Sequence, residues 1–507
     1  MGWWKWDRIC ENVRRGSTKI ASAIGFPRLS RYKKKMTIAS KSDLYRLLPS
    51  VDELLKSSAL TELLAREGQP AVTESVRVVL SSVRDEISAG TLATQQAVGL
   101  AVSHLPQAVA RHLSIAMEFS LKPVINATGV ILHTNLGRAP LADAAIRRII
   151  EVAGGYSNLE FDIAAGERGK RDVHVERLFS RLLNQDGVSG IRTVVVNNCA
   201  AAVMLALNTL AEGGEVIVSR GELVEIGGSF RVPDVMAKSG AVLREVGTTN
   251  RTRLADYESA ITDKTRLLLR VHRSNFAIIG FTEQPSLEEL AALGRKHGIP
   301  VMEDLGGGAM IPLRALGVNE SGVMESLRAG ADLITYSGDK MLGGPQAGLL
   351  SGREDLIKRV RSNPLFRALR VDKLTYSALE GTLMEYIRQN HDAIPFARMM
   401  RLAAADIRAR AEAVQAQLSG AAHLKTAIIA GESLVGGGSA PTSSLPTFLL
   451  AVTAESLSAD ELATRLRHND PPIVTRVEDG RVLLDLRTAF GATEDAVIAH
   501  ALLSLAL

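Results

Sequence analysis

The feature that most constrains the fold is a series of seven short, β-branched segments separated by amphipathic helices. Chains in which strands alternate with helices form a mostly parallel sheet with helices on both faces. The predicted strands are Thr193–Asn197, Glu215–Ser219, Ala241–Val246, Arg266–His272, Pro300–Glu303, Leu333–Ser337 and Gly348–Ser351. The predicted fold class is therefore α/β, with a mostly parallel seven-stranded sheet covered on both faces.

Helical and mixed segments flank this central region. The spacing of Leu44, Leu47, Leu48 and Val51 is typical of an amphipathic helix. A long helical stretch is also predicted over Val371–Leu418. We divide the chain into a basic leader (1–35), a helical N-terminal domain (36–118), the α/β domain (119–375) and a linking helix with a small C-terminal α+β domain (376–507).

The C-terminal domain is predicted from one further strand, a helix and a hairpin. These elements are the strand Thr447–Val452, the helix Ala459–His468 and the hairpin strands Ile473–Val477 and Val482–Asp485. Asp479-Gly480 has the residue types of a tight hairpin turn. The run Gly436-Gly437-Gly438-Ser439-Ala440-Pro441, which precedes this domain, predicts a flexible connection.

Positive charge is concentrated in the leader. Residues 1–35 contain ten Lys or Arg and only two acidic residues, whereas the 507-residue chain has a formal net charge of +5. The remainder is therefore slightly acidic. Two interpretations of the leader stay open, namely that translation begins at Met36 or that the leader is a basic arm that binds nucleic acid. The leader lacks the apolar core of a secretory signal.

Composition excludes several classes of protein. With 46% hydrophobic and 23% charged residues, the chain is an ordinary globular protein. No apolar run approaches the roughly 20 residues of a membrane span. The chain has two cysteines, too few for a disulfide framework or a four-cysteine metal site. We therefore expect no bound metal, and we expect a reducing, cytoplasmic location.

The most informative local signal is a lysine in a glycine-rich turn that follows a predicted strand. Lys340 lies in Ser337-Gly338-Asp339-Lys340-Met341-Leu342-Gly343-Gly344. In open α/β sheets ligands bind at the carboxyl ends of the strands. A lysine there can form a Schiff base with pyridoxal phosphate, and Ser337 can bind the cofactor's phosphate. An isolated motif of this kind is more often a surface loop.

An acidic residue follows the preceding strand. Asp304 lies in Val301-Met302-Glu303-Asp304-Leu305-Gly306, at the end of a buried strand. A carboxylate at this position can pair with the protonated ring nitrogen of pyridoxal phosphate. Alone, Asp304 could equally be a turn or capping residue. An Asp after one strand and a Lys after the next is more specific.

A strand that turns directly into an Ala-rich helix supplies a third element. The free backbone N–H groups and the positive end of such a helix bind phosphate. Asn198, Cys199 and Ala200 are the expected contacts. We interpret Cys199 as a small wall residue rather than a nucleophile, because no histidine stands near it in the sequence.

Longer motifs occur in five segments: Val124–Gly129, His133–Arg138, Ser219–Gly228, Glu245–Arg251 and Ser337–Gly348. These motifs resemble those of the bacterial selenocysteine synthases, the L-seryl-tRNA(Sec) selenium transferases. The similarity runs from about Ser42 to the C-terminus. The resemblance implies a fold-type I pyridoxal-phosphate enzyme that forms a homodecamer, a pentamer of dimers. It further implies conversion of seryl-tRNA(Sec) to selenocysteinyl-tRNA(Sec) with selenophosphate.

The resemblance also assigns roles to residues of this chain. Lys340 becomes the cofactor lysine, with Asp339 as a candidate acid–base partner. Arg138, Arg367 and Arg370 become the selenophosphate ligands, and the helical domain 36–118 the tRNA-binding domain. A guanidinium fork suits an oxyanion, although Arg367 and Arg370 alone would indicate a solvated helix face.

Two other functions stay open from the residues alone. A small-molecule pyridoxal-phosphate lyase or desulfurase would need the same lysine, acid and phosphate cup. An RNA-binding scaffold without catalysis would not need them. A further set of polar residues at predicted strand ends or loops is interpreted as structural: His133, Arg220, Glu222, Glu225 and His272.

Overall fold

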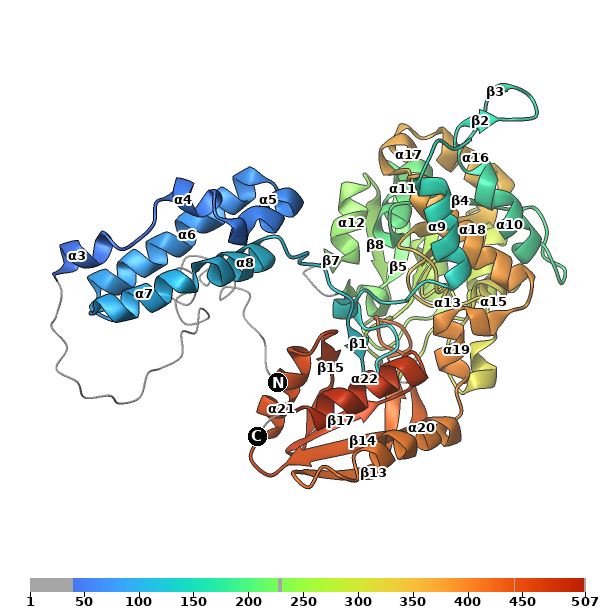
Figure 1. Cartoon of the computed structure of the whole chain (residues 1–507). Helices are drawn as coiled ribbons and strands as arrows, with labels where there is room; N and C mark the ends of the chain where they lie inside the picture. Colours follow the sequence, from blue (N-terminus) through green and yellow to red (C-terminus); the bar gives the residue numbers. More distant parts are fainter. Residues whose placement is uncertain (1–39, 227–229, 442, 506–507) are drawn as a thin grey trace. The chain divides into compact units, whose positions relative to one another are not determined.

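The computed structural model describes residues 40–226, 230–441 and 443–505, so the predicted leader lies outside the described residues. The chain divides into two compact units, Met1–Lys122 and Pro123–Leu507 (Figure 1). Within the described residues, no helix is both long and apolar enough to cross a bilayer. Each unit is considered separately below.

The first unit is helical and has a core of its own. Its apolar residues between Leu44 and Leu113 form one buried cluster. The helix α6 contributes more of it than any other helix, because Val72, Val76 and Val83 repeat along one face. The helices are α3 (Lys41–Tyr45), α4 (Val51–Leu55), η1 (Ser58–Leu60), α5 (Thr61–Glu67), α6 (Gln69–Ser88), α7 (Gln95–Ser103) and α8 (Leu105–Ala116).

A seven-stranded sheet forms the centre of the second unit. Its strands, in spatial order, are β4 (Ile191–Val196), β12 (Gly348–Arg353), β11 (Leu333–Ser337), β10 (Val301–Gly306), β9 (Thr265–Val271), β5 (Glu215–Ser219) and β8 (Val242–Val246). Only β12 runs antiparallel to its neighbours within this sheet. All seven predicted strands are present, and the prediction of a mostly parallel sheet is confirmed.

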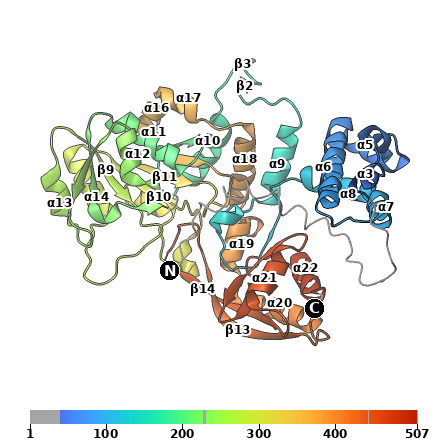
Figure 2. The ribbon, with the colours of Figure 1, turned by 90° about the vertical axis from the view of Figure 1, so that its left-hand side faces the viewer.

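Helices cover both faces of this sheet (Figure 2). Side chains alternate along β4, so that Val194 and Val196 join one buried cluster and Val195 joins the other. The helices of one face are α11 (Cys199–Ala211), α12 (Val232–Lys238), α16 (Glu354–Ser362) and α17 (Pro364–Leu369). Those of the other are α10 (Val173–Leu183), α13 (Leu254–Ala260), α14 (Leu287–His297), α15 (Val323–Arg328) and α18 (Lys373–Ile387).

Shorter elements connect these layers. They are β1 (Ile125–Asn126), η2 (Thr134–Leu136), α9 (Asp143–Ala153), β2 (Phe161–Asp162), β3 (Glu167–Arg168), η3 (Arg220–Glu222), β6 (Glu225–Ile226), β7 (Phe230–Arg231), η4 (Leu313–Leu316) and η5 (His391–Ala393). The helix α9 packs against α18. At that contact a Cβ on Gly381 would lie 2.4 Å from the Ala145 Cα, so glycine permits the close approach.

A second sheet occupies the C-terminal part of the same unit. It has the order β13 (Leu424–Leu434), β14 (Ser444–Ala454), β17 (Arg481–Asp485) and β16 (Arg476–Glu478), and it packs against α20 (Ala404–Gln417), α21 (Ala459–Arg467) and α22 (Ala492–Leu503). Asp479 and Gly480 have φ of 49° and 69°, as the predicted tight turn requires. A short parallel pair, β1 with β15 (Ile473–Val474), joins the start of the unit to this region.

Some C-terminal predictions differ from the structure. The predicted long helix is divided into α18, α19 (Pro395–Arg401) and α20. A proline at the first position of α19 cannot continue a preceding helix. The strand β13 and the helix α22 were not predicted, because neither has a clear apolar alternation or helical stripe.

The glycine run Gly436–Gly438 is closely packed rather than a loose connection. All three residues have positive φ, between 64° and 74°. A Cβ on Gly436 would lie 2.4 Å from Val130 Cγ1, and one on Gly437 would lie 2.8 Å from Leu132 Cβ. Glycine is therefore needed here for close backbone approach and a left-handed conformation, which corrects the predicted flexible connection.

A buried arginine fastens the C-terminal sheet to the helix α19. Arg487 is 2% exposed. Its guanidinium donates hydrogen bonds to Ser433 Oγ and to the carbonyl oxygens of Met399, Leu402 and Pro446. Ser433 in turn donates to the buried carboxylate of Asp485 at 2.6 Å. The network therefore satisfies a buried cation and a buried anion together.

We expect Arg487→Met to lower the free energy of unfolding by about 3–5 kcal/mol, because the substitution leaves a buried carboxylate without its cation. Urea denaturation measures this difference. Arg408→Met is the matched control, since Arg408 is exposed and pairs with Glu412 one helical turn away. Loss of that pair should cost less than about 1 kcal/mol. Equal effects of the two substitutions would contradict the role assigned to Arg487.

Candidate functional site

A small pocket lies at the carboxyl ends of β9, β10 and β11. Its volume is about 50 Å³. It is lined by Cys199, Ala200, Val203, Val232, Val235, His272, Ser274, Asp304, Gly306 and Lys340. The lysine, the acid and two residues of the expected phosphate cup thus lie together, although they come from three separate segments of the chain. We call this the Lys340 pocket.

Lys340 is held by a tight turn after β11. Its carbonyl oxygen accepts from Gly343 N at 2.9 Å, and the next residue, Met341, donates its N–H to Gly307 O at 2.9 Å. The side chain is 7% exposed. A Cβ on Gly306 would lie 3.9 Å from Lys340 Nζ, so the glycine after β10 leaves room beside the amine. Burial and open space on one side are what a nucleophilic or basic amine requires.

Asp304 points toward α11, whereas its neighbour Glu303 points to the opposite face of the sheet. Its Oδ1 accepts hydrogen bonds from Thr335 Oγ1 at 2.9 Å and from Cys199 Sγ at 3.5 Å. No group in the described part of the chain donates to Oδ2. Burial raises the pKa of Asp304, against the opposing effect of these hydrogen bonds and of the Lys340 and His272 charges. A cationic N–H at Oδ2 would stabilise the ionised form.

Cys199 forms part of the pocket wall. Burial and the nearby Asp304 carboxyl raise the pKa of its thiol well above the ordinary value. The thiol therefore stays protonated and donates to Asp304, which is not the state of a nucleophile. Ser337, the expected phosphate ligand, is 5% exposed and lies outside the lining of the Lys340 pocket.

The start of α11 forms the expected cup. Asn198 is its N-cap, and its side chain accepts from Ala201 N at 2.9 Å. Among the described residues, none accepts from the N–H groups of Cys199 and Ala200, which remain available to an anion. The neighbouring strand approaches closely, since a Cβ on Gly348 would lie 1.9 Å from Asn198 O. A glycine is therefore required beside the cup.

Arg138 lies directly beside the lysine turn. Its Nη1 donates to Asp339 Oδ2 at 2.7 Å, and Ala139 N donates to Asp339 O at 3.2 Å. The arginine has a left-handed φ of 63°, which is costly for a residue with a side chain. Its Nε is buried and has no acceptor within the described ranges. A donor of this kind is suited to an oxyanion.

Arg370 and Arg367 occupy a different position. Arg370 pairs with Val196 through a β-bridge and donates to Glu160 Oε1 at 3.4 Å. It lines a cavity of about 690 Å³ that also includes Asn198 and Gln346. Arg367 is exposed at the end of α17 and forms no ion pair with any residue that the structure describes. Neither Arg138 nor Arg367 lines the cavity that Arg370 lines.

Most of the other polar residues have structural partners. Glu222 is fully buried and accepts from Val271 N at 3.0 Å and from Gln284 Nε2 at 2.5 Å. Arg220 pairs with Glu245, and Glu225 with Arg231. His133 differs, because its buried Nδ1 has no partner in the described part of the chain and burial lowers its pKa.

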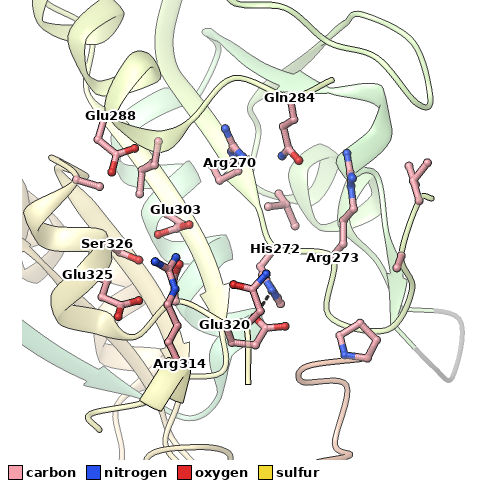
Figure 3. Close-up of a pocket in the computed structure, with 18 of the residues that line it drawn as sticks. Arg270, His272, Arg273, Gln284, Glu288, Glu303, Arg314, Glu320, Glu325 and Ser326 are labelled. Carbon is pink, nitrogen blue, oxygen red and sulfur yellow. Dashed lines mark ion pairs between the residues drawn. The ribbon is translucent and has the colours of Figure 1, made fainter. Parts of the chain in front are cut away.

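Two residues near the site were missed from the sequence. Thr335 binds Asp304 because the parallel register places the two side by side on β11 and β10; that pairing could have been found by aligning the strand ends. Glu320 pairs with His272 beside a second, larger cavity (Figure 3). It lies in an irregular loop, where no sequence pattern marks it.

Comparisons with known proteins show which family this chain is similar to. A family model described as L-seryl-tRNA selenium transferase matches residues 124–490. A second one, described as selenocysteine synthase N terminal, matches residues 45–84.

Curated relatives are similar over most of the chain. The protein named L-seryl-tRNA(Sec) selenium transferase from Geotalea uraniireducens is 48% identical, over 89% of this chain and 97% of the relative. Proteins of the same name from Caldanaerobacter subterraneus and Aquifex aeolicus are 45% and 48% identical, over 91% and 75% of this chain and 98% and 84% of theirs.

Among solved structures, D-glucosaminate-6-phosphate ammonia-lyase is similar with a TM-score of 0.53 at 22% identity, over 76% of this chain and 96% of that one. This likeness concerns the fold, and the predicted fold-type I α/β architecture is confirmed. On the extent of the family model and the identity to its curated members, this chain belongs to the L-seryl-tRNA selenium transferase family of enzymes.

Proposed function

We propose that this enzyme converts seryl-tRNA(Sec) to selenocysteinyl-tRNA(Sec), with pyridoxal 5′-phosphate bound at Lys340 and selenophosphate as the selenium donor. The observation that carries the proposal is the Lys340 pocket, in which a buried amine, a buried carboxylate and a helix N-terminus lie together. Membership of the family supports the tRNA substrate.

The donor set of the pocket matches this cofactor. Lys340 Nζ would bind the aldehyde, and Asp304 Oδ2 would accept a hydrogen bond from the ring nitrogen. The free N–H groups of Cys199 and Ala200 would bind the phosphate. The site thus offers one complementary group for each end of the molecule. When bound, the cofactor withdraws electrons from the serine Cα and makes its proton acidic.

Lys340 then acts as the general base. Its amine removes the proton from the serine Cα, so that the β-hydroxyl can leave as water. Asp304 holds its negative charge next to the ring nitrogen throughout. Because burial disfavours that charge, Thr335 and Cys199 stabilise it by hydrogen bonds to Oδ1.

Arg138 is proposed to bind selenophosphate. It forms an ion pair with Asp339, the residue before Lys340. Its buried Nε lacks an acceptor among the described residues. Selenium then adds to Cβ, and the phosphate is released by hydrolysis. Asp339 orients Arg138 and is the proposed acid–base partner of Lys340. Arg367 and Arg370 complete the anion site in this proposal.

Incubation with seryl-tRNA(Sec) and selenophosphate, followed by identification of the aminoacyl group, tests the proposed function. We expect selenocysteine on the tRNA. A parallel reaction with free serine, cysteine or selenocysteine tests the alternative of a small-molecule lyase or desulfurase. Turnover of the free amino acids, with none of the seryl-tRNA(Sec), would overturn the proposal.

Substitution of the proposed anion ligands should separate the two halves of the reaction. We expect Arg138→Ala, Arg367→Ala and Arg370→Ala each to slow selenium transfer by about 10- to 100-fold, because each removes a charge-assisted hydrogen bond. Cofactor absorbance and tRNA affinity should stay unchanged. Arg138→Lys is the control that keeps the charge but not the fork. Normal selenium transfer in all three alanine variants would show that the anion binds elsewhere.

The helical unit is proposed to bind the tRNA. The match of residues 45–84 to the N-terminal family model supports this role. We expect removal of residues 1–122 to abolish tRNA(Sec) binding in a filter or gel assay. Cofactor absorbance should persist, since the Lys340 pocket is lined only by residues of the second unit. Unchanged tRNA affinity would contradict the proposal.

A homodecamer is also part of the proposal, on the resemblance stated above. Assembly offers a physical reason for the position of Arg367, which is exposed in the single chain. Light scattering of the purified protein measures the oligomer mass directly. A monomer would contradict this part of the proposal.

A further inference from the structure

A polar cavity of about 770 Å³ adjoins the Lys340 pocket (Figure 3). It opens between β9, β10 and the segments that contain α14 and α15, and charged side chains line it. Among the described residues, His272 is the one that lines both this cavity and the Lys340 pocket. His272 therefore borders both the polar cavity and the pocket that Asp304 lines.

Two contacts fix the position of His272. Its Nε2 lies 2.6 Å from Glu320 Oε2, and the two side chains are 26% and 11% exposed. Its backbone N–H donates to Asp304 O at 2.9 Å. The register of β9 and β10 places the preceding residue, Val271, opposite Asp304. The imidazole is thus held by Glu320, and the backbone of His272 is held by that of Asp304.

The charge of His272 is set by its neighbours. Burial lowers the pKa of His272, but the Glu320 contact and the charges of Glu303 and Asp304 more than offset this, so that the pKa is raised. The charged groups that face it from the surrounding segments are Glu320, Glu303, Asp304, Lys340, Arg273 and Arg314. The imidazole therefore stays cationic to a higher pH than a free histidine.

Asp304 needs such a cation. Lys340 and His272 are the cationic side chains among the described residues that line its pocket. Lys340 must give up its proton before it can react with an aldehyde or act as a base. From that point His272 is the remaining positive charge of the pocket that can hold Asp304 ionised against the cost of burial.

We infer that His272, oriented by Glu320, is a positioning residue that keeps the Asp304 carboxylate ionised for the ring nitrogen of the cofactor. The inference rests on the proposed function only in that pyridoxal phosphate binds at Lys340. It does not depend on the tRNA or on selenium. It assigns a role to His272, which the sequence alone indicated to be structural. It also assigns a role to Glu320, which the sequence alone did not single out.

The inference predicts a particular dependence on pH. A carboxylate loses its charge as the pH falls through its pKa, so the affinity for the cofactor should fall at acidic pH. A nearby imidazolium lowers the pKa of Asp304 and moves this fall to lower pH. In His272→Gln the fall should therefore begin at higher pH than in the wild type, and Glu320→Gln, which keeps the imidazole but not the contact that orients it, should lie between the two.

The experiment compares the full-length enzyme with His272→Gln, Glu320→Gln and Glu288→Gln. Glu288 is the matched control, because it is an exposed glutamate that lines the same cavity. Apoenzyme is titrated with pyridoxal phosphate between pH 6 and 9, with absorbance as the readout. The ¹⁵N resonance of ring-labelled cofactor reports whether its nitrogen is protonated. Neither measurement requires tRNA or turnover.

We expect His272→Gln to bind the cofactor up to about tenfold more weakly at the acid end of this range, the effect of one unit in the pKa of Asp304, with the ¹⁵N resonance shifted toward the unprotonated form. The variant should approach the wild type as the pH rises. Glu320→Gln should show a smaller loss with the same dependence on pH. Glu288→Gln should match the wild type throughout.

Unchanged affinity and an unchanged ¹⁵N resonance in both His272→Gln and Glu320→Gln would overturn the inference and leave the proposed function intact. The same result follows if the weakening in His272→Gln does not depend on pH, since that behaviour indicates a structural role alone. A wild-type enzyme that fails to bind the cofactor at Lys340 would overturn both proposals.

Discussion

Lys340→Ala is expected to abolish the visible-edge absorbance of the bound cofactor and to reduce turnover by roughly 10⁴-fold, the upper end for loss of a positioned general base. The amine is the group that joins the aldehyde and also removes the Cα proton, so one substitution removes both. Absorbance spectra of the purified variant and single-turnover assays with seryl-tRNA(Sec) measure the two losses. We expect little change in the free energy of unfolding, because the substitution removes an amine that lines the open space of the Lys340 pocket.

Lys358→Ala is the matched control for this substitution. Lys358 is an exposed residue of α16 that pairs with Glu354, and its removal should change neither spectrum nor rate. Borohydride reduction followed by mass spectrometry identifies the modified lysine independently. A cofactor tag on a lysine other than Lys340 would contradict the assignment of the site.

Asp304→Asn is expected to lower turnover by about 100- to 1,000-fold, the range seen when one preorganised electrostatic group is removed from an active site. Asparagine fits the same space and can still accept from Thr335, but it carries no charge for the ring nitrogen. Cofactor should still bind, more weakly, because Lys340 and the α11 cup are intact. Rapid-quench measurement of water elimination from the seryl group reports the chemical step.

Cys199→Ser provides the comparison for Asp304→Asn. The hydroxyl keeps a donor near Asp304 Oδ1 and leaves the carboxylate in place, so the rate should stay within a few-fold of the wild type. If Asp304→Asn retained the wild-type rate, the ring nitrogen would not depend on this carboxylate. If Cys199→Ser lost as much activity as Asp304→Asn, the thiol would have a role beyond the pocket wall.

The seven strands of the central sheet could be predicted because each is a short apolar run, most of them with β-branched residues, bounded by polar or glycine-rich segments. The hairpin at Asp479-Gly480 was equally clear from its residue types. The strand β13 was not, because its exposed and buried residues do not alternate regularly. The packed turn at Gly436–Gly438 was misjudged, since glycine marks both loose linkers and close approaches.

Lys340, Asp304 and the start of α11 were predicted to lie together because parallel strands place their carboxyl ends at one edge of a sheet, and the structure places them in one pocket. The positions of Arg138, Arg367 and Arg370 relative to one another could not be predicted in this way. They lie outside the strand ends, and their distances depend on how loops and helices pack.

The order of residues along the chain therefore determined the sheet, the strand ends and the identity of the reactive groups, because local periodicity and strand-end chemistry are written in neighbouring residues. Only the tertiary structure decided which partners tune those groups. Thr335 and His272 reach Asp304 through strand register, and Glu320 reaches His272 from an irregular loop. Contacts of this kind depend on packing between distant segments, which a linear pattern does not encode.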